Sequence, residues 1–207
     1  MLENRTLTPL AKALSVILHP VLIPVWVMLV LISQGLLLSY ATTQAKVYFG
    51  LVIVLNTVAV PAVCTFLFNR VRFWRENPNV DFRRRILPMA VMIICYGACL
   101  VMIRDFPFAY PVKKMLMAGI GCLLFGLGVT FFWKVSLHMT AQGAVVAFMG
   151  VMLLSGAEKM LPVFCISIAL AALLASARLW LGAHDWKQVA AGFAGGVVIT
   201  ILTIYLI

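Results

Sequence analysis

The chain has 207 residues, of which 64% are hydrophobic and 11% are charged, and its formal net charge is +10 at pH 7. Soluble domains carry about 25% charged residues, and a single core cannot bury so much apolar surface, so an ordinary soluble domain is excluded. The basic residues fall mostly in short segments between apolar stretches. Topology signals and anionic lipid headgroups explain them there, and we expect no nucleic-acid partner.

Apolar stretches without Asp, Glu, Lys or Arg follow one another along the whole sequence. Each is long enough, or nearly so, to cross a bilayer, and in lipid a helix satisfies the backbone polar groups of such a segment. The sequence therefore predicts an all-α fold, a single integral membrane domain over 1–207 that forms a polytopic bundle of six to seven transmembrane helices. The stretches are 13–45, 47–69, 86–103, 115–133, 135–157, 160–177 and 189–207.

The first and last stretches carry residues that shape helices. His19-Pro20 and Pro24 should kink the first stretch or delay its first turn. His19 could line an aqueous face with other polar residues, but a place at the headgroup level is the interpretation we favour. In the last stretch Gly192 and Gly196 lie four apart, which favours close packing against another helix, as does the alanine-rich stretch before it.

Three polar clusters lie at the ends of stretches. Charged side chains and histidines are costly in lipid, which makes such clusters candidates for a functional site. Each pair of spans returns the chain to the side it left, so all three clusters are expected on one membrane face. A basic run alone is usually a topology anchor, and His138 alone an interfacial histidine; together the clusters favour a site. They are Arg83 and Arg85 before Pro88; Lys134, Ser136 and His138; and Arg178, His184 and Gln188.

These residue types suit phosphoryl transfer. Arginine and lysine can hold the charged oxygens of a phosphate, and a serine hydroxyl adds a donor. One histidine can attack phosphorus while a second protonates the leaving oxygen. Spaced four apart on a helix, His184 and Gln188 would share a face, so that the amide orients the ring. Two histidines without carboxylates make a poor metal site, and we expect no metal and no cofactor.

The clusters resemble the three sequence blocks of the type 2 phosphatidic acid phosphatase (PAP2) superfamily of membrane lipid phosphatases, whose core is related to vanadium haloperoxidases. The third block is matched best: Arg178 is followed after five residues by His184, and His184 after three residues by position 188. Gln188 replaces the family's aspartate, and Ala177 replaces the serine that precedes the arginine. The second is matched by Ser136 and His138, and the first loosely, by Arg83 and Arg85 ahead of Pro88.

The resemblance implies a PAP2-like helical core over about 81–207, with His184 as the nucleophile that forms a phosphohistidine and His138 as general acid. It also implies a set of phosphate-binding residues. The expected activity is hydrolysis of a lipid phosphomonoester or diphosphate such as phosphatidate, phosphatidylglycerophosphate or a polyprenyl diphosphate. The phosphate-binding set is Arg83, Arg85, Lys134, Ser136 and Arg178.

Two alternatives stay open at this point. One is a PAP2-like protein with a weakened site that binds lipid phosphates or serves in an assembly. The other is a transporter. This alternative is less favoured, because no charged residue falls in the middle of an apolar stretch, where a transport site would need one. We expect the bacterial inner membrane as the location. Most of the 16 lysines and arginines fall on the side of the clusters, so the positive-inside rule places the site at the cytoplasmic face.

Overall fold

The computed structural model describes residues 7–36, 41–70 and 80–206, with the backbone alone at 68–70 and 80–85. Throughout the described part the chain is helical and contains no strand, which confirms the predicted all-α class. The chain divides into two compact units: one joins Met1–Ile23 to Lys134–Ile207, and the other is Pro24–Trp133. The single domain expected from the sequence stays a prediction.

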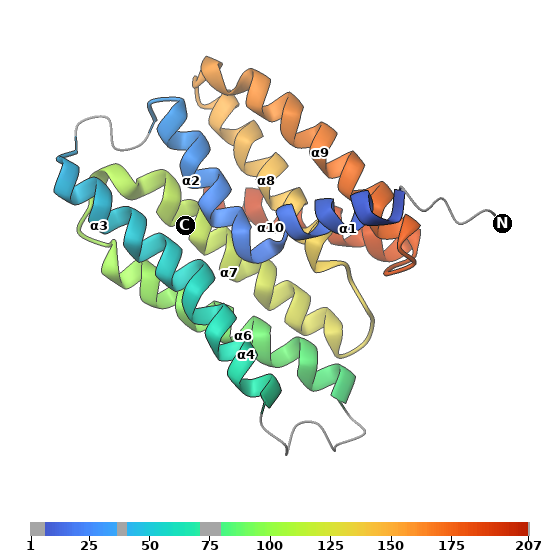
Figure 1. The fold of residues 1–207 in the computed structure, drawn as a ribbon. Helices are drawn as coiled ribbons and strands as arrows, with labels where there is room; N and C mark the ends of the chain where they lie inside the picture. The colour runs from blue at the N-terminus through green and yellow to red at the C-terminus, as the bar shows by residue number, and fades with distance from the viewer. Residues whose placement is uncertain (1–6, 37–40, 71–79, 207) are drawn as a thin grey trace. The chain divides into compact units, whose positions relative to one another are not determined.

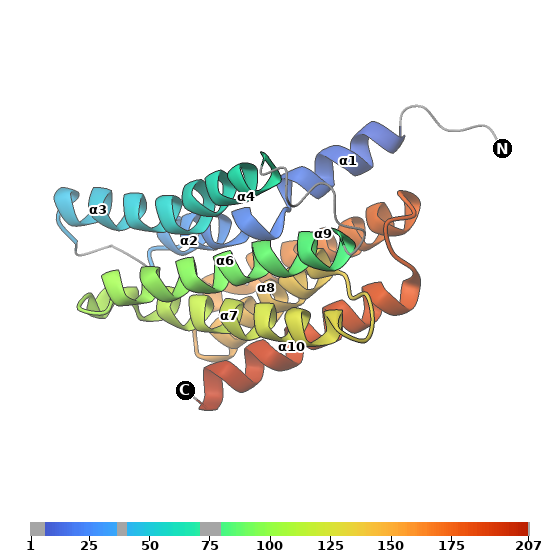
Figure 2. The same ribbon diagram turned by 90° about the horizontal axis from the view of Figure 1, so that it is seen from below.

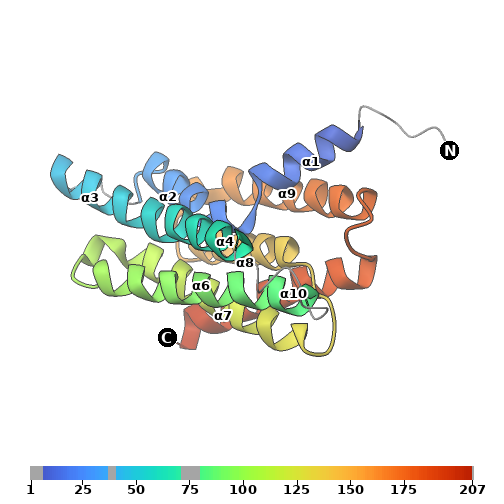
Figure 3. The ribbon, with the colours of Figure 1, turned by 60° about the horizontal axis from the view of Figure 1, so that its bottom comes forward.

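The first unit contains the N-terminal helix and the C-terminal third of the chain. Helix α9 returns alongside α8, and α10 packs closely on α8, so the start of α8, the end of α9 and the start of α10 lie together (Figure 1). Helix α1 runs beside α9 (Figure 3), where the Trp180 indole Nε1–H donates to Thr8 Oγ1 at 3.4 Å. The elements are α1 (Leu7–Ile17), η1 (Pro20–Leu22), α8 (Leu137–Leu154), η4 (Glu158–Met160), α9 (Leu161–Trp180) and α10 (Trp186–Leu206).

Glycines bring α8 and α10 unusually close. A Cβ atom at Gly196 would lie 2.0 Å from the Thr140 carbonyl oxygen, and one at Gly192 would lie 2.6 Å from the carbonyl oxygen of Ser136. From the other helix, a Cβ at Gly143 would lie 2.1 Å from the Phe193 carbonyl oxygen. The close packing predicted from Gly192 and Gly196 is confirmed, and backbone contact takes the place of side-chain interdigitation along this helix pair.

The second unit is built from α2 to α7. Helices α3 and α4 are joined by the single π-helical stretch η2 into one continuous element, and α6 and α7 run side by side (Figure 2). Proline lies within the first two positions of η3 and α7, where the missing N–H costs no helical hydrogen bond. The elements are α2 (Ile23–Ser33), α3 (Thr43–Val54), η2 (Leu55–Ala59), α4 (Val60–Arg70), α6 (Val80–Met102), η3 (Pro107–Ala109) and α7 (Tyr110–Thr130).

Among the described residues, five helices are long and apolar enough to cross a membrane, and the bent pair Leu7–Ile17 and Pro20–Ser33 makes six if it is one span. This indicates an integral membrane protein, as the sequence predicts. The predicted stretch 86–103 forms most of α6, whose apolar part among the described residues, Ile86–Met102, is shorter than those five helices. The break in the first stretch falls at His19-Pro20, as expected from the proline.

Candidate functional site

The start of α8 is anchored on the first turn of α10. The Ser136 backbone N–H donates to the carbonyl oxygen of Gln188 at 3.2 Å, an approach that Gly192 permits because it has no side chain. The Ser136 carbonyl accepts from both the backbone and the hydroxyl of Thr140 (2.9 and 3.1 Å), so its backbone is fully used. The Ser136 side chain is fully buried, and its Oγ has no hydrogen-bond partner within the described part of the chain.

A sharp turn connects α9 to α10. Gly182 has φ of 61°, a left-handed conformation that glycine adopts without cost. Around it the Ala183 N–H donates to the Arg178 carbonyl (3.2 Å) and the Gly182 N–H to the Leu179 carbonyl (3.0 Å), the two bonds of a Schellman motif. The motif ends α9 two residues after Arg178 and reverses the chain. As a result, Arg178 and His184 lie at the same end of the unit.

His184 does not lie on a helix, in contrast to the sequence prediction, but its predicted contact with Gln188 forms. Helix α10 begins at Trp186, and the Asp185 carboxylate caps it by accepting from the Gln188 N–H at 2.8 Å. His184 Nδ1 lies 2.7 Å from Gln188 Oε1. An amide oxygen can only accept, so Nδ1 carries the hydrogen and Nε2 of the neutral ring carries the lone pair. Gln188 thus fixes the tautomer and the orientation of the ring.

Arg178 and the histidines form one electrostatic cluster. Arg178, His19 and His184 all interact electrostatically with the half-buried His138 ring. Arg178 is itself half-buried, and its Nε is a buried donor without a hydrogen-bond partner among the described residues. The second and third predicted clusters therefore meet at one end of the unit. Ser136 lies two residues before His138, so this end of the unit carries two buried donors without a partner among the described residues, Ser136 Oγ and Arg178 Nε.

The structure adds two contributors to this cluster: Ser15, which the sequence analysis missed, and His19, whose place it left open. His138 Nε2 lies 3.1 Å from the Ser15 carbonyl oxygen, and the rings of His19 and His138 meet edge to face, with centroids 5.1 Å apart and an interplanar angle of 90°. Of the two interpretations left open for His19, these contacts support the one in which it lies with the other polar residues. The available signal was His19-Pro20 itself, because a polar residue at a proline break of an apolar stretch has its side chain at a helix end.

The remaining predicted residues are not brought into the cluster by what the structure describes. Lys134 belongs to the same unit, just ahead of α8, and its side chain is exposed. The side chains of Arg83 and Arg85 lie outside the described residues, and both positions belong to the other unit. Their contribution to phosphate binding stays a prediction. Among the described residues, no three His, Cys, Asp or Glu side chains lie close enough together to hold a metal ion.

No family model matches the chain, and the searches of curated proteins and of solved structures found no match either. Fold and geometry define a helical protein with membrane-length apolar helices and a cluster of histidines, arginine and serine at one end of its N- and C-terminal unit.

Proposed function

We propose that the protein is a membrane phosphatase of the PAP2 type, which hydrolyses the phosphomonoester or diphosphate of a lipid through a phosphohistidine. The observation that carries the proposal is that the hydrogen bond between Ser136 and Gln188 and the turn from α9 to α10 bring the helix ends that carry His138, Arg178 and His184 together. The buried donors on Ser136 and Arg178 support a phosphate as the ligand. Long apolar helices around the cluster support a substrate that stays in the bilayer.

In the proposed reaction His184 is the nucleophile. Its Nε2 carries the lone pair because Nδ1 donates to Gln188 Oε1, and Nε2 attacks phosphorus while the bond to the lipid oxygen breaks. The leaving oxygen takes its proton from Nδ1 of His138 in the imidazolium form, which the negative charge of the bound phosphate favours. A water molecule then attacks the phosphohistidine, gives its proton to His138 and releases inorganic phosphate, which restores both histidines. No proton or phosphoryl group remains unaccounted for.

The phosphate oxygens are held by charge and by hydrogen bonds. Arg178 supplies its guanidinium, including the unpartnered Nε, and Ser136 supplies its hydroxyl. Lys134, exposed just before α8, would reach the outer side of the phosphate. Arg83 and Arg85 complete the clamp in the proposal. Charge that develops on these oxygens in the transition state is where fixed donors act most strongly.

The test is release of inorganic phosphate from phosphatidate, phosphatidylglycerophosphate and polyprenyl diphosphate in mixed micelles. We expect His184→Ala to lower the rate by at least about 10³-fold, because it removes the nucleophile. Lys187→Ala is the matched control: Lys187 is exposed, lies three residues from His184 and has no role in the mechanism, so its rate should stay within about twofold. Turnover that survives His184→Ala contradicts the mechanism.

A second candidate, a lipid-phosphate binder without turnover, is favoured by one observation: the partner of His184 is an amide, which cannot neutralise an imidazolium. In the serine-protease triad, replacing the carboxylate by an amide costs about 10⁴-fold, largely through the wrong tautomer. Here Oε1 faces Nδ1, so the tautomer is retained and the loss should be smaller. Binding without phosphate release by the unaltered protein, together with release by Gln188→Asp, would favour the binder.

We place the cluster at the cytoplasmic face of a bacterial inner membrane, as the charge distribution predicts. The ends of α8 and α9 allow a direct test. Lys187→Cys, in the first turn of α10, marks the cluster end of the unit, and Glu158→Cys, between α8 and α9, marks the opposite end. Each is made in a background with the five native cysteines replaced. A maleimide that cannot cross the membrane should label position 158 from outside and position 187 only after the membrane is opened.

A further inference from the structure

The break between α1 and η1 places a histidine against the candidate general acid. Pro20 fixes the local backbone, and His19 before it is extended, with φ of −65° and ψ of 137°, as residues before proline prefer. His19 Nδ1 accepts from the Val21 N–H at 3.3 Å and so caps η1. With Nδ1 used as an acceptor, the hydrogen of the neutral ring is on Nε2. The His19 side chain is therefore held in place by its own backbone.

The same break frees a carbonyl for His138. Ser15 belongs to the last turn of α1, whose final carbonyl groups have no partner within the helix. His138 Nε2 lies 3.1 Å from the Ser15 oxygen, and because a carbonyl only accepts, Nε2 carries hydrogen in both protonation states of the ring. The proton that His138 gives to a leaving group, and takes back, is thus the one on Nδ1.

Two contacts from one segment hold the His138 ring. The hydrogen bond to Ser15 fixes the position of Nε2, and the edge-to-face contact with His19 fixes the plane of the ring. We propose that His19 is a positioning residue for His138, which holds Nδ1 toward the cluster that contains Arg178 and His184. The role in catalysis rests on the proposed function, but the positioning itself does not.

Other charged groups also act on His138. Arg178 reaches it from α9 and His184 from the turn before α10, in addition to His19. Both remain in a variant that changes His19 alone. If the tautomer of His138 or the rate that depends on it changes in such a variant, the change is due to the missing imidazole, provided that the break between α1 and η1 is intact.

Two substitutions separate the ring from the cap. His19→Asn keeps a side-chain acceptor for the Val21 N–H, since asparagine is a preferred capping residue, but removes the ring. His19→Phe keeps an aromatic ring against His138 and removes the acceptor. If His19 positions His138, kcat should fall roughly tenfold in the asparagine variant, with KM within about twofold, and should fall less in the phenylalanine variant. The opposite order, or no change in either variant, overturns the proposal.

A measurement without turnover keeps the two proposals distinguishable. The chain has only three histidines, so nitrogen NMR of histidine-labelled protein in detergent resolves each ring, with assignments from single substitutions. In the unaltered protein His138 should show a protonated Nε2 and an unprotonated Nδ1 at neutral pH. In His19→Asn, but not in His19→Phe, these two signals should move toward each other as the tautomers mix. Unchanged signals in His19→Asn refute the positioning role even in an active enzyme, whereas the expected change in a protein without turnover refutes only the phosphatase.

Discussion

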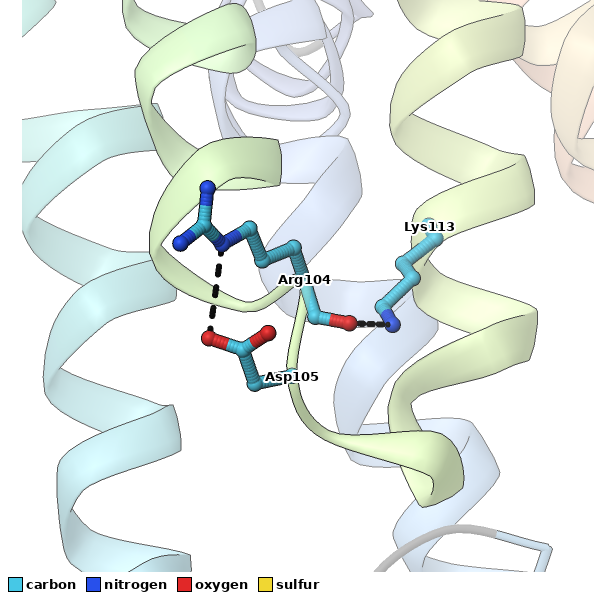
Figure 4. Close-up of polar contacts among 3 residues, drawn as sticks. All are labelled: Arg104, Asp105 and Lys113. Atoms are coloured by element: carbon cyan, nitrogen blue, oxygen red, sulfur yellow. Dashed lines mark hydrogen bonds and ion pairs between the residues drawn. The ribbon is translucent and has the colours of Figure 1, made fainter.

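Two connections between helices carry similar residues and hold them in different ways. Between α6 and α7, Arg104 Nε pairs with the adjacent Asp105 Oδ2 at 3.4 Å, and the Lys113 ammonium donates to the Arg104 carbonyl (Figure 4). The side chains of this pair are 72% and 82% exposed. Between α9 and α10, Arg178 is half-buried and acts on His138 of another helix, and Asp185 binds backbone rather than a cation.

The difference is one of partners rather than of charge. An exposed pair of adjacent residues contributes about 0–1 kcal/mol and is screened by salt, so the α6–α7 connection needs no role beyond solvation. In the α9–α10 connection the backbone turn and the capped helix bring Arg178 and His184 to one end of the unit, where Arg178 Nε is buried without a partner among the described residues. Unsatisfied buried donors are costly, and the proposed phosphate would accept from this one.

In this comparison the largest effect is expected from removing Arg178, with Arg104 as its matched control. Arg178→Gln should lower kcat/KM for lipid phosphate hydrolysis by roughly 10²-fold or more, because it removes a fixed donor from the transition state. Arg104→Gln, the matched loss of one charge, should change kcat/KM by less than about twofold. The measurement is phosphate release over a range of substrate concentrations. Similar losses in both variants would mean that overall charge, and not the α9–α10 cluster, determines the rate.

A smaller effect is expected at the helix contact that supports the cluster. Gly196→Ala puts a methyl group where the Thr140 carbonyl oxygen lies 2.0 Å away, so α8 and α10 must separate; we expect a loss of about 2–3 kcal/mol. Gly97→Ala is the control, since nothing lies within 4 Å of a Cβ there, and it should be neutral or stabilising by up to about 1 kcal/mol. Denaturant unfolding in detergent micelles compares them. Equal stability of the two variants would show that this contact is not rigid.

Much of the fold could be predicted from the sequence because apolar stretches, prolines and glycines act locally. The helices, the break at Pro20 and the packing at Gly196 follow from such signals. The contact between His184 and Gln188 was also predicted, although for a different reason: the residues are close because Asp185 caps the helix between them. The contact of His138 with Ser15 joins residues 123 apart, and no local pattern encodes a pairing of that kind. The convergence of Arg83 and Arg85 with the other clusters stays a prediction.

The smallest effect distinguishes the two aspartates of the compared connections. Both are exposed, but the Asp185 carboxylate caps α10 and the Asp105 carboxylate only pairs with Arg104. Loss of an N-cap costs about 1 kcal/mol, so Asp185→Ala should lower the free energy of unfolding by about that amount, and Asp105→Ala by less than about 0.5 kcal/mol. The capped N–H group belongs to Gln188, so Asp185→Ala should also loosen the side-chain amide that orients His184 and lower kcat severalfold. Asparagine, a good capping residue, should restore both stability and kcat at position 185; recovery of stability without kcat would assign the carboxylate a part in the chemistry itself.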